Sequence, residues 1–544
     1  MNGAAPASSG KLLTFEKERP CQPNNQSPDS GTNVVAKTPP YVPDTSFSAA
    51  PHFSFNQKDV DLLAQHGTTV IRLGVMWAGV EPVRGQVNQT YLAEVGKIVQ
   101  MCSDAGIYVL LDFHQDLLSE KFCGEGVPLW LFNPPSSGAD AFPVPLNNNA
   151  SYSADANGIP SYNDCTLQPN FSRYVLADQV GKSYQALYSN TNNVRDAFIN
   201  YWTVVAKFFL PYKNILGYDL MNEPWVGDIR TDAKLLLNPV YADEHSLQPF
   251  YDIIATAIRG VDPSALIHFE SSSIVQDQAG FTAVPGGATF SNTSVYNFHY
   301  YADQVGGQGL EQVLQSRIGT ATVLGCGAIL SEYEAGSGPG AANVVNVSRS
   351  ADEVFLSAIG WEFKEYDTVP IITGLNHALL DPFTGVIRQD FATAFSRPYA
   401  HAIAGVPVSM HFDDAISVFV VTYNFNGAVG PGALTEVRTN FASHYPGGWK
   451  VLVVATSGAF EVLADHGVSN NAIYVVPSVG NAPTAGAGVA LAVYPQNVTM
   501  ATLTAPPAIS NATPVSTKKS SSWTLGRSFI IMRVCVLALF LGLG

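Results

Sequence analysis

The stretch Gly217-Tyr-Asp-Leu-Met-Asn-Glu-Pro-Trp225 ends an apolar run with an amide and a carboxylate, and Pro224 then interrupts it. Because proline lacks the N–H that strand pairing needs, regular pairing should stop there. The pattern predicts a strand over residues 215–222 that ends at Asn222, with Glu223 just beyond it. One interpretation is a plain strand followed by a turn. The other is a general acid or base, which needs a second carboxylate elsewhere in the chain.

Seven further segments have the pattern of short apolar strands, and longer amphipathic segments separate several of them. The eight predicted strands span residues 32–36, 69–75, 107–114, 215–222, 265–270, 295–301, 327–332 and 360–366. Helices are predicted over residues 57–66 and 92–105, the second ended by Gly106. Eight such units predict an α/β fold, a closed (β/α)8 TIM barrel with its chemistry at the C-terminal strand ends.

A second carboxylate, Glu332, ends the seventh predicted strand and should face Glu223 across the barrel mouth. Two carboxyl groups about 5 to 5.5 Å apart, one protonated and one ionised, can serve as acid/base and nucleophile in retaining glycoside hydrolysis. We expect burial and the neighbouring carboxylate to raise the pKa of Glu223. Glu334 is the alternative nucleophile, since strand alternation points it to the same side. Glu362 and Glu365 are interpreted as residues that face solvent or sugar.

Other polar and aromatic side chains near the strand ends follow the same period of two. His114 and Asp116 share one side of the chain, as do His299 and Tyr301, so each pair can present polar groups to one sugar ring. The alternative interpretation of His114–Asp116 is a polar loop, and that of His299–Tyr301 is an aromatic core cluster. Trp361 is a candidate platform for the apolar face of a sugar. The candidates at the strand ends are Arg72, His114, Asp116, Asn222, Glu223, His299, Tyr301, Glu332 and Trp361.

Beyond residue 405 the pattern changes to short strands separated by Gly, Pro and Asn turns, which predicts a small β-sandwich. This part contributes no carboxylate pair, so a packing or membrane-facing role is expected. The predicted organisation is a polar, disordered N-terminal segment over 1–30, a catalytic barrel over 31–405, the sandwich over 406–504, a disordered stalk over 505–527 and a hydrophobic tail over 528–544.

The composition excludes several classes of function. A net charge of −16 with 13% charged residues leaves no basic surface that would attract nucleic acid. None of the six cysteines falls in a Cys-x-x-Cys pattern, so neither a zinc site nor a redox motif is predicted. We therefore expect no metal, no cofactor and no protein partner.

Two features indicate a secretory route and a membrane. Residues 1–30 lack the apolar segment of a signal peptide, but glycosylation sequons begin at Asn88, Asn149, Asn170, Asn292, Asn346, Asn497 and Asn511. The apolar run 534–544 is too short for a span of about 20 residues. Small residues at 520–522, a spacer and this run have the layout of a lipid-anchor signal, with a tail anchor or plain disorder as alternatives. We expect an extracellular or membrane-associated protein.

Several segments are long enough to compare with known families. They are Arg72-Leu-Gly-Val-Met-Trp-Ala-Gly-Val-Glu-Pro-Val-Arg-Gly-Gln86, Leu111-Asp-Phe-His-Gln-Asp116, Phe122-Cys-Gly-Glu-Gly-Val-Pro128, Gly217-Tyr-Asp-Leu-Met-Asn-Glu-Pro-Trp225, Asn297-Phe-His-Tyr-Tyr301 and Arg397-Pro-Tyr-Ala-His-Ala-Ile-Ala-Gly405. Together they resemble the endoglycoceramidases of glycoside hydrolase family five, roughly over residues 32–405. The resemblance implies a (β/α)8 barrel followed by a C-terminal β-sandwich, no metal, and hydrolysis between the reducing-end glucose of a glycosphingolipid and its ceramide.

The resemblance also implies roles for individual residues. It makes Glu223 the acid/base, Glu332 the nucleophile and Asn222 the partner of the sugar next to the scissile bond. The positions that match sugar-contacting residues are Lys37, His114, Asp116, Tyr301 and Trp361, and His299 is added to this substrate-binding set. Two segments depart from the family pattern: the chain before Gly31, and Ser331-Glu-Tyr-Glu-Ala-Gly336, which keeps Glu334 as the alternative nucleophile.

A long loop from Leu117 to Ser183 follows the third predicted strand, and loops of this length are usually functional. Cys123 and Cys165 are candidates for a disulfide that stiffens it, with free buried thiols as the alternative. The apolar residues that cluster after Cys123 are interpreted as a surface for the ceramide tails. They are Val127, Leu129, Trp130, Leu131 and Phe132.

Three functions agree with these observations. The first is an endo-acting glycosidase that separates the oligosaccharide of a glycosphingolipid from ceramide, with the lipid and a membrane surface as its partners. The second is a relative that removes a single glucose from glucosylceramide or from a steryl glucoside, which needs a closed sugar cleft. The third is an inactive glycolipid-binding protein, which the presence of both carboxylates disfavours.

Overall fold

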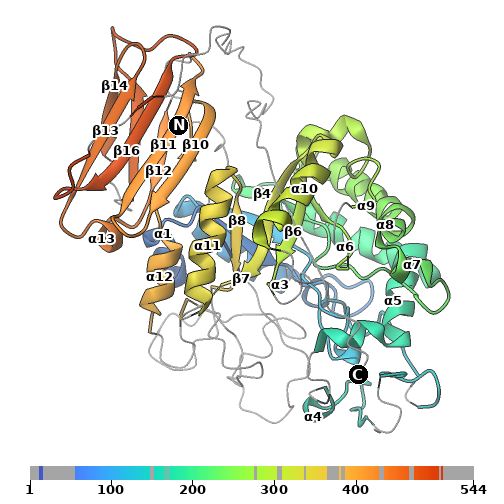
Figure 1. Cartoon of the computed structure of the whole chain (residues 1–544). Helices are drawn as coiled ribbons and strands as arrows, with labels where there is room; N and C mark the ends of the chain where they lie inside the picture. The colour runs from blue at the N-terminus through green and yellow to red at the C-terminus, as the bar shows by residue number, and fades with distance from the viewer. Residues whose placement is uncertain are drawn as a thin grey trace.

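The structure is a computed structural model that describes residues 11–15, 55–135, 137–146, 152–165, 167, 171–274, 279–302, 309–335, 339–363, 379–380, 386–427, 434–464, 471–500 and 504–505. These residues form a helix-covered barrel and a separate pair of sheets built from the C-terminal part of the chain (Figure 1). No helix among them is long and apolar enough to cross a membrane.

Eight parallel strands form the barrel in chain order, and β8 pairs with β1 to close it. They are β1 (Lys11–Phe15), β2 (Val70–Gly74), β3 (Tyr108–Asp112), β4 (Ile215–Asp219), β5 (Ile267–Glu270), β6 (Ser294–Tyr300), β7 (Gly327–Glu334) and β8 (Ala358–Trp361). The predicted (β/α)8 barrel is therefore confirmed, and the positions of strands two to eight agree with the prediction to within a few residues.

The position of the first strand differs from the prediction. We expected it over Thr32–Ala36, with residues 1–30 disordered, but Lys11–Phe15 pairs in parallel with both β2 and β8. Lys11-Leu-Leu-Thr-Phe15 has enough apolar character for a strand, and the polar residues on both sides obscured this short run in the sequence. Residues 32–36 lie outside the part of the chain that the structure describes.

Helices and short helical turns connect the strands and surround the barrel (Figure 1). The α-helices are α1 (Gln57–Gln65), α2 (Trp77–Val80), α3 (Gln89–Asp104), α4 (Tyr162–Cys165), α5 (Asp178–Ser189), α6 (Val194–Phe209), α7 (Lys234–Leu237), α8 (Pro239–Ala242), α9 (Gln248–Val261), α10 (Leu310–Leu324), α11 (Pro339–Glu353) and α12 (Gln389–Phe395). The shorter turns are η2 (Glu120–Phe122), η3 (Phe171–Leu176), η4 (Thr191–Asn193), η5 (Asp243–Leu247) and η6 (Ala288–Thr293).

Local sequence explains where the predicted helices start. Asn56 caps α1, because its side chain accepts from the backbone N–H of Lys58 at 3.0 Å while Asp59 accepts from the N–H of Asn56 at 2.9 Å. Asn88 caps α3 in the same manner, accepting from the N–H of Tyr91 at 3.1 Å. These caps satisfy N–H groups that the first turn of a helix leaves unpaired.

The interior of the barrel is layered along the strands. Val70, Leu110, Ile329 and Ile359 form a small buried apolar cluster inside it. Because side chains alternate along a strand, the residue two positions further on lies on the same face, one layer nearer the C-terminal ends. On β2 that residue is Arg72, and on β3 and β8 the same step leads to Asp112 and Trp361. An apolar layer thus supports a charged layer at the mouth of the barrel.

The C-terminal domain consists of two antiparallel four-stranded sheets, as the predicted β-sandwich requires. One sheet has the order β10-β11-β16-β13 and the other the order β14-β15-β12-β9. The strands are β9 (Tyr399–Ala402), β10 (Gly405–Asp413), β11 (Val418–Phe425), β12 (Thr435–Arg438), β13 (Trp449–Ala455), β14 (Phe460–Ala464), β15 (Ala472–Pro477) and β16 (Gly488–Pro495), with α13 (Phe441–His444) between β12 and β13.

Two of these strands correct the predicted organisation. The edge strands β9 and β14 were not expected from the sequence, and β9 places the start of the sandwich before the predicted boundary at residue 406. β9 was assigned to the barrel because Arg397–Gly405 is part of a family-like segment. Its pairing with β12 could not be predicted from the sequence, since a four-residue edge strand has little periodicity of its own.

The two domains are in direct contact through buried polar groups. The Tyr399 hydroxyl donates to the backbone oxygen of Gly67 at 2.7 Å, and the Asn471 amide donates to that of Gln65 at 2.7 Å. Arg397, whose side chain is fully buried, pairs with Asp352 of α11 at 2.8 Å. Breaking such a buried ion pair costs about 3 to 5 kcal/mol, so these contacts hold the sandwich firmly on the barrel.

His401 on β9 gives the sandwich a specific dependence on pH. Burial, and secondarily the charge of Arg438, lower the pKa of His401 to about 3. The unfolded chain therefore takes up this proton between its ordinary pKa of about 6.5 and the folded value, so His401 costs stability as the pH falls through that window. His401→Phe keeps a ring against Tyr399 and should reduce the loss of unfolding free energy between pH 7 and pH 4.5 by on the order of 2 kcal/mol.

Thermal or urea unfolding of the two proteins at both pH values measures this difference. The matched control is His411→Phe, which removes an exposed histidine from β10 of the same domain. If His401→Phe and His411→Phe lost the same stability on acidification, the assignment to His401 would be wrong.

Candidate active site

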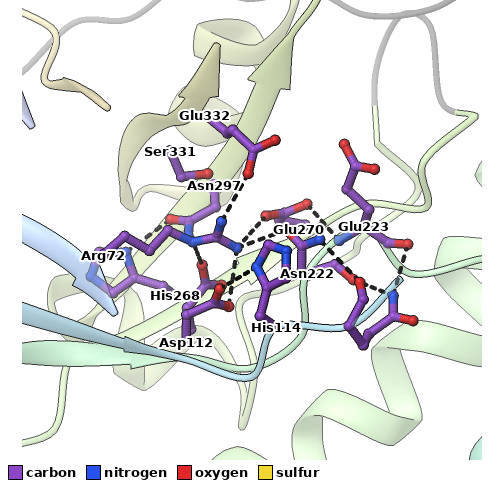
Figure 2. A network of polar contacts seen from close by, with 12 residues as sticks. Arg72, Asp112, His114, Asn222, Glu223, His268, Glu270, Asn297, Ser331 and Glu332 are labelled. Carbon is purple, nitrogen blue, oxygen red and sulfur yellow. Dashed lines mark hydrogen bonds and ion pairs between the residues drawn. The ribbon is translucent and has the colours of Figure 1, made fainter. Parts of the chain in front are cut away.

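Arg72 lies at the centre of the charged layer and connects four strands. Its side chain is 1% exposed, and Nε contacts Asp219 at 2.8 Å, Nη2 contacts Asp112 at 3.0 Å and Nη1 contacts Glu332 at 3.1 Å. Nη2 also donates to Oδ1 of Asn222 at 2.8 Å. Figure 2 shows the guanidinium directed into this ring of oxygens. A planar fork with five donors suits such a position, and it fixes Glu332 and Asn222 relative to each other.

The aspartates beside Arg72 have raised pKa values. Burial raises the pKa of Asp112 to about 7 against the opposing charge of Arg72, and it raises that of Asp219 to about 6. The same carboxylates raise the pKa of Arg72 well above its usual value, although burial opposes this. Arg72 is therefore always charged, and the carboxylates at the mouth of the barrel are arranged around it.

Glu332 near the end of β7 is held through both of its carboxylate oxygens. Oε2 accepts from Arg72, and Oε1 accepts from the hydroxyl of Tyr301 at 2.6 Å. The side chain is 8% exposed, so two directed donors replace most of its water. Two donors that converge on its oxygens fix the direction of this carboxylate, as the role of a nucleophile requires. Of the two candidates on this strand, Glu332 is the one in the cluster with Glu223 and His299.

Glu223 has an unusual backbone conformation, with φ of 37°, in the left-handed region that non-glycine residues seldom adopt. The Gln115 amide donates to the backbone oxygens of Asn222 at 2.6 Å and of Glu223 at 3.3 Å. Gln115 Oε1 accepts in turn from the buried hydroxyl of Tyr184 at 2.7 Å. Such conformations persist where the surroundings impose them, so Gln115 and Tyr184 help to hold Glu223 in place.

His299 connects the two carboxylates. Its Nδ1 lies 2.8 Å from Oε1 of Glu223 and 3.8 Å from Oε1 of Glu332. Oxygen atoms of Glu223 and Glu332 and a ring nitrogen of His299 all lie within 4.8 Å of one another. The predicted pair of carboxylates therefore does meet at the barrel mouth, with a histidine between them.

The protonation of this cluster corrects one expectation. Burial alone would raise the pKa of Glu223, as we expected, but the hydrogen bond and charge of His299 outweigh it and the pKa is lowered. Burial lowers the pKa of His299, but the charges of Glu270 and Glu332 and the contact with Glu223 raise it well above 6.5. In the free protein the proton of this pair therefore resides on His299.

A second group of candidates lies beside the carboxylates. His114 stacks on Trp361 with ring centroids 5.3 Å apart and planes 14° apart, and its Nδ1 contacts Asp112 at 2.8 Å. Its Nε2 lies 3.9 Å from Asp116, whose side chain is 24% exposed. The structure thus brings together His114, Asp116 and Trp361 next to the charged layer, as the period of two predicted. Lys37 and Glu365 lie outside the described residues.

Within the part of the chain that the structure describes, two clusters have ligand atoms close enough together to bind a cation. One is Glu223 with His299 and Glu332, and the other is His114 with Asp116 and Glu125. In the first cluster Arg72 and Tyr301 already donate hydrogen bonds to Glu332. The oxygens of this carboxylate therefore have partners without an ion. The expected absence of a metal stays a prediction.

Of two other expectations about the loops, one is wrong and the second is wrong for part of its residues. Glu362, interpreted as facing solvent or sugar, is 1% exposed and therefore faces neither. Val127 and Phe132 are buried, and the Trp130 ring packs edge-on against Trp77 while its Nε1 donates to the backbone oxygen of Glu81 at 2.8 Å. Val127 and Phe132 thus belong to the core and cannot contribute to a surface for ceramide, whereas Leu129, Trp130 and Leu131 are half-buried. An apolar run in sequence does not distinguish an exposed patch from a packed one.

The loop after β3 is closed by a covalent link. Cys123 and Cys165 form a disulfide with their Cα atoms 5.5 Å apart. The loop folds back on the site, since Asp116 and Glu125 bridge as in an antiparallel pair and Lys121 donates to the backbone oxygen of Phe132 at 2.9 Å. The disulfide thus stabilises the segment that carries His114 and Asp116.

One functional residue, Glu270, was missed by the sequence analysis. It ends β5 and is 4% exposed, and Oε1 lies 3.0 Å from His299 Nε2 while Oε2 accepts from the backbone N–H of Glu223 at 3.2 Å. The signal was present, because Glu270 ends its predicted strand just as Glu332 does.

The fold and the site together define a class of protein, a glycoside hydrolase with two carboxylates at the C-terminal mouth of a (β/α)8 barrel. The chain belongs to glycoside hydrolase family 5. Residues 36–367 match the family described as cellulase (glycosyl hydrolase family 5), and residues 397–484 match the glycoside hydrolase family 5 C-terminal domain. The second match begins before residue 405, in agreement with the corrected start of the sandwich.

Similar proteins include two cnidarian endoglycoceramidases. The one from Cyanea nozakii is 34% identical over 425 residues, which cover 78% of this chain and 82% of that protein. The one from Hydra vulgaris is 34% identical over 421 residues, covering 77% and 78% respectively. Among solved structures, endo-glycoceramidase II from Rhodococcus sp. in a ganglioside GM3 complex has a TM-score of 0.58 at 20% identity and covers 83% of this chain and 95% of its own. At this identity it supports the fold.

Proposed function

We propose that this protein is a retaining endoglycosylceramidase, which hydrolyses the β-glucosidic bond between the oligosaccharide and the ceramide of glycosphingolipids. The observation that carries the proposal is the cluster of Glu223, His299 and Glu332 within 4.8 Å. One oxygen of Glu223 thus lies closer to one of Glu332 than the roughly 6.5 to 9.5 Å between carboxyl groups that inversion needs, which supports direct attack by one carboxylate. The substrate follows from the two relatives at 34% identity, both endoglycoceramidases.

In the first step Glu332, held by Arg72 and Tyr301, attacks the anomeric carbon of the glucose. The bond to the ceramide oxygen breaks, and that oxygen takes a proton from Glu223, which receives it from His299 Nδ1 at 2.8 Å. As Glu332 becomes an ester it loses its negative charge. This removes one of the charges that keep His299 protonated, so the transfer becomes easier as the bond breaks.

In the second step a water molecule attacks the same anomeric carbon and releases the sugar from Glu332. Glu223, now ionised, accepts the proton of that water, and the proton returns to the Glu223–His299 pair. The pair thus holds one transferable proton in the free enzyme, none in the glycosyl-enzyme and one again at the end. The proton on Nε2 of His299 is not part of this count. Charge and atoms balance without any further group.

The remaining candidates bind the sugar in this proposal. Asn222 uses Oδ1 to accept from Arg72 and one N–H of Nδ2 to donate to the backbone oxygen of Gln115 at 3.1 Å, which leaves its second N–H for a sugar hydroxyl. Asp116 and His114 offer hydrogen-bonding groups to the next hydroxyls, and Trp361 offers an aromatic face. Lys37 is assigned to the same set by resemblance to the family.

We propose further that the protein is a glycoprotein of the secretory pathway that works extracellularly or at a membrane, with the apolar tail over 528–544 as a lipid-anchor signal. A disulfide between Cys123 and Cys165 supports an oxidising compartment. Among the sequons, Asn292, Asn346 and Asn497 are exposed and therefore accessible to glycan transfer. Enzymatic removal of N-glycans from protein secreted by a eukaryotic host should lower its mass, and an unchanged mass contradicts this part of the proposal.

The deciding experiment for the substrate is incubation with a ganglioside and, separately, with glucosylceramide, followed by mass spectrometry of the sugar released. An intact oligosaccharide from the ganglioside is expected. Glucose from glucosylceramide or from a steryl glucoside, with the ganglioside untouched, would instead establish the single-glucose activity. No product from any of them would support the glycolipid-binding alternative.

A further inference from the structure

Glu270 is a third buried carboxylate at the mouth, and the two-carboxylate mechanism does not use it. It ends β5, next to β4, which leads into Glu223, and β6, which carries His299. In Figure 2 its carboxylate lies between Arg72 and Glu223. A carboxyl group whose side chain is 4% exposed is costly to bury unless it is paired on several sides, so the contacts of Glu270 indicate what it does.

The contacts of Glu270 form a closed ring with the acid/base. Oε2 accepts from the backbone N–H of Glu223 at 3.2 Å, and Oε1 is in an ion pair with Nε2 of His299 at 3.0 Å. The other ring nitrogen of His299, Nδ1, contacts the carboxylate of Glu223 at 2.8 Å. Glu270 therefore holds Glu223 at both ends, at the backbone directly and at the carboxylate through His299.

This arrangement orients the imidazole. Nε2 is paired with the Glu270 carboxylate at 3.0 Å, so the proton that can pass to Glu223 is the one on Nδ1, which contacts the carboxylate of Glu223 at 2.8 Å. The groups paired with His299 are Glu270 on β5, Glu332 on β7 and Glu223 after β4. Asp112 on β3 and Asp219 on β4 also interact with its charge, and Arg72 approaches Glu270 itself at 3.8 Å. Glu332 forms a bond to the sugar and Glu223 exchanges a proton during the reaction, so Glu270 is the carboxyl group beside His299 that takes part in neither step.

We propose that Glu270 is a positioning residue of the acid/base, which acts through His299 to keep a transferable proton next to Glu223 and through the backbone N–H to keep Glu223 in its left-handed conformation. The proposal rests on the double displacement proposed above. Its chemistry is a proton shift only: the Nδ1–H bond of His299 breaks, an O–H bond forms on Glu223, and Nε2–H stays with Glu270.

The test is the pH dependence of kcat/KM for Glu270→Gln. The substitution keeps the shape and leaves an amide oxygen for the N–H of Glu223, but it removes the negative charge beside His299. The Glu223–His299 pair should then lose its proton at a lower pH, so the alkaline limb of the profile should move to lower pH by about 1 to 3 units. At a pH above the new limb, kcat/KM should fall at least tenfold, while an aryl glycoside with a strongly acidic leaving group should be spared.

A purely structural role would lower the rate and leave the limb where it is, so an unmoved limb in a folded, active Glu270→Gln overturns the proposal. The double variant Glu270→Gln/His299→Gln gives a second check. If Glu270 acts through His299, its substitution should not move the limb again in the His299→Gln background, and an equal shift in both backgrounds would also overturn it. Glu436→Gln, a buried carboxylate paired with Arg438 in the sandwich at 2.6 Å, is the matched control.

Should Glu270→Gln not yield folded protein, Glu270→Asp serves the same purpose. The shorter side chain keeps the charge but cannot reach both partners, so the limb should move in the same direction by a smaller amount. An unmoved limb with a lowered rate overturns the proposal here as well. The activity of the wild type separates the proposed substrate from the proposed role of Glu270. If the wild type cleaves aryl glycosides but no glycolipid, the proposed substrate is refuted, and the role of Glu270 can still be tested on the aryl glycoside.

Discussion

Glu332→Gln is expected to lower kcat on the ganglioside by on the order of 10⁴-fold or more, because it replaces the nucleophile by an amide that cannot attack the anomeric carbon. The amide preserves the size of the side chain, and its oxygen can still accept from Arg72 or Tyr301. The fold should therefore persist, and thermal unfolding should show a melting temperature within a few degrees of the wild type. A loss of activity with an intact fold assigns the effect to chemistry.

The matched control is Glu334→Gln, two residues further along β7 and the other candidate from the sequence. Its backbone oxygen accepts from the Asn343 side chain at 2.6 Å, a contact that the substitution leaves untouched. A 2-deoxy-2-fluoro glycoside that traps the glycosyl-enzyme should label the wild type on Glu332, as peptide mass spectrometry can determine. A label on Glu334, or full activity of Glu332→Gln, would refute the assignment.

Glu223→Gln is expected to have the second largest effect, and its size should depend on the leaving group. The alkoxide of ceramide is a poor leaving group that needs protonation, so kcat/KM on a glycosphingolipid should fall by about 10²- to 10⁴-fold, the usual contribution of general acid catalysis. An aryl glycoside whose leaving group is already stable as an anion needs no proton, and its kcat/KM should change far less.

Turnover of that aryl substrate should then be limited by the second step, in which Glu223 acts as the base. Azide needs no base, so its addition should restore turnover and give a glycosyl azide with the stereochemistry of the substrate. Equal losses of kcat/KM on both substrates, without rescue by azide, would show that Glu223 is not the acid/base. A product of inverted anomeric configuration from the wild type would refute the retaining mechanism itself.

Much of the site was accessible from local pattern. Glu223 and Glu332 were found because each follows an apolar run of strand length, and parallel strands in a closed barrel bring such ends together. The pairs His114 with Asp116 and His299 with Tyr301 followed from the period of two. These inferences succeed because the barrel is regular: once the strands are located, the position of a side chain along its strand determines how near the mouth it lies.

Other features depend on contacts between distant segments, and no window of sequence contains them. The strand Lys11–Phe15 is recognised through its pairing with β2 and β8, and β9 through its pairing with β12. The apolar run around Trp130 has the composition of a surface patch, but Val127 and Phe132 in it are buried and Trp130 packs edge-on against Trp77. Whether a side chain is buried depends on the segments that pack against it. Composition alone therefore could not distinguish an exposed apolar run from a packed one.

The sequence by itself therefore determined the barrel, the two candidate carboxylates and the family resemblance, since these depend on periodicity and on residues at strand ends. Only the tertiary structure decided where the proton resides. The pKa of Glu223 is lowered and not raised, because His299 stands between it and Glu332 while Glu270 holds the far side of the imidazole. Electrostatic interactions between groups on β4, β5, β6 and β7 set that balance, and their distances exist only in the folded protein.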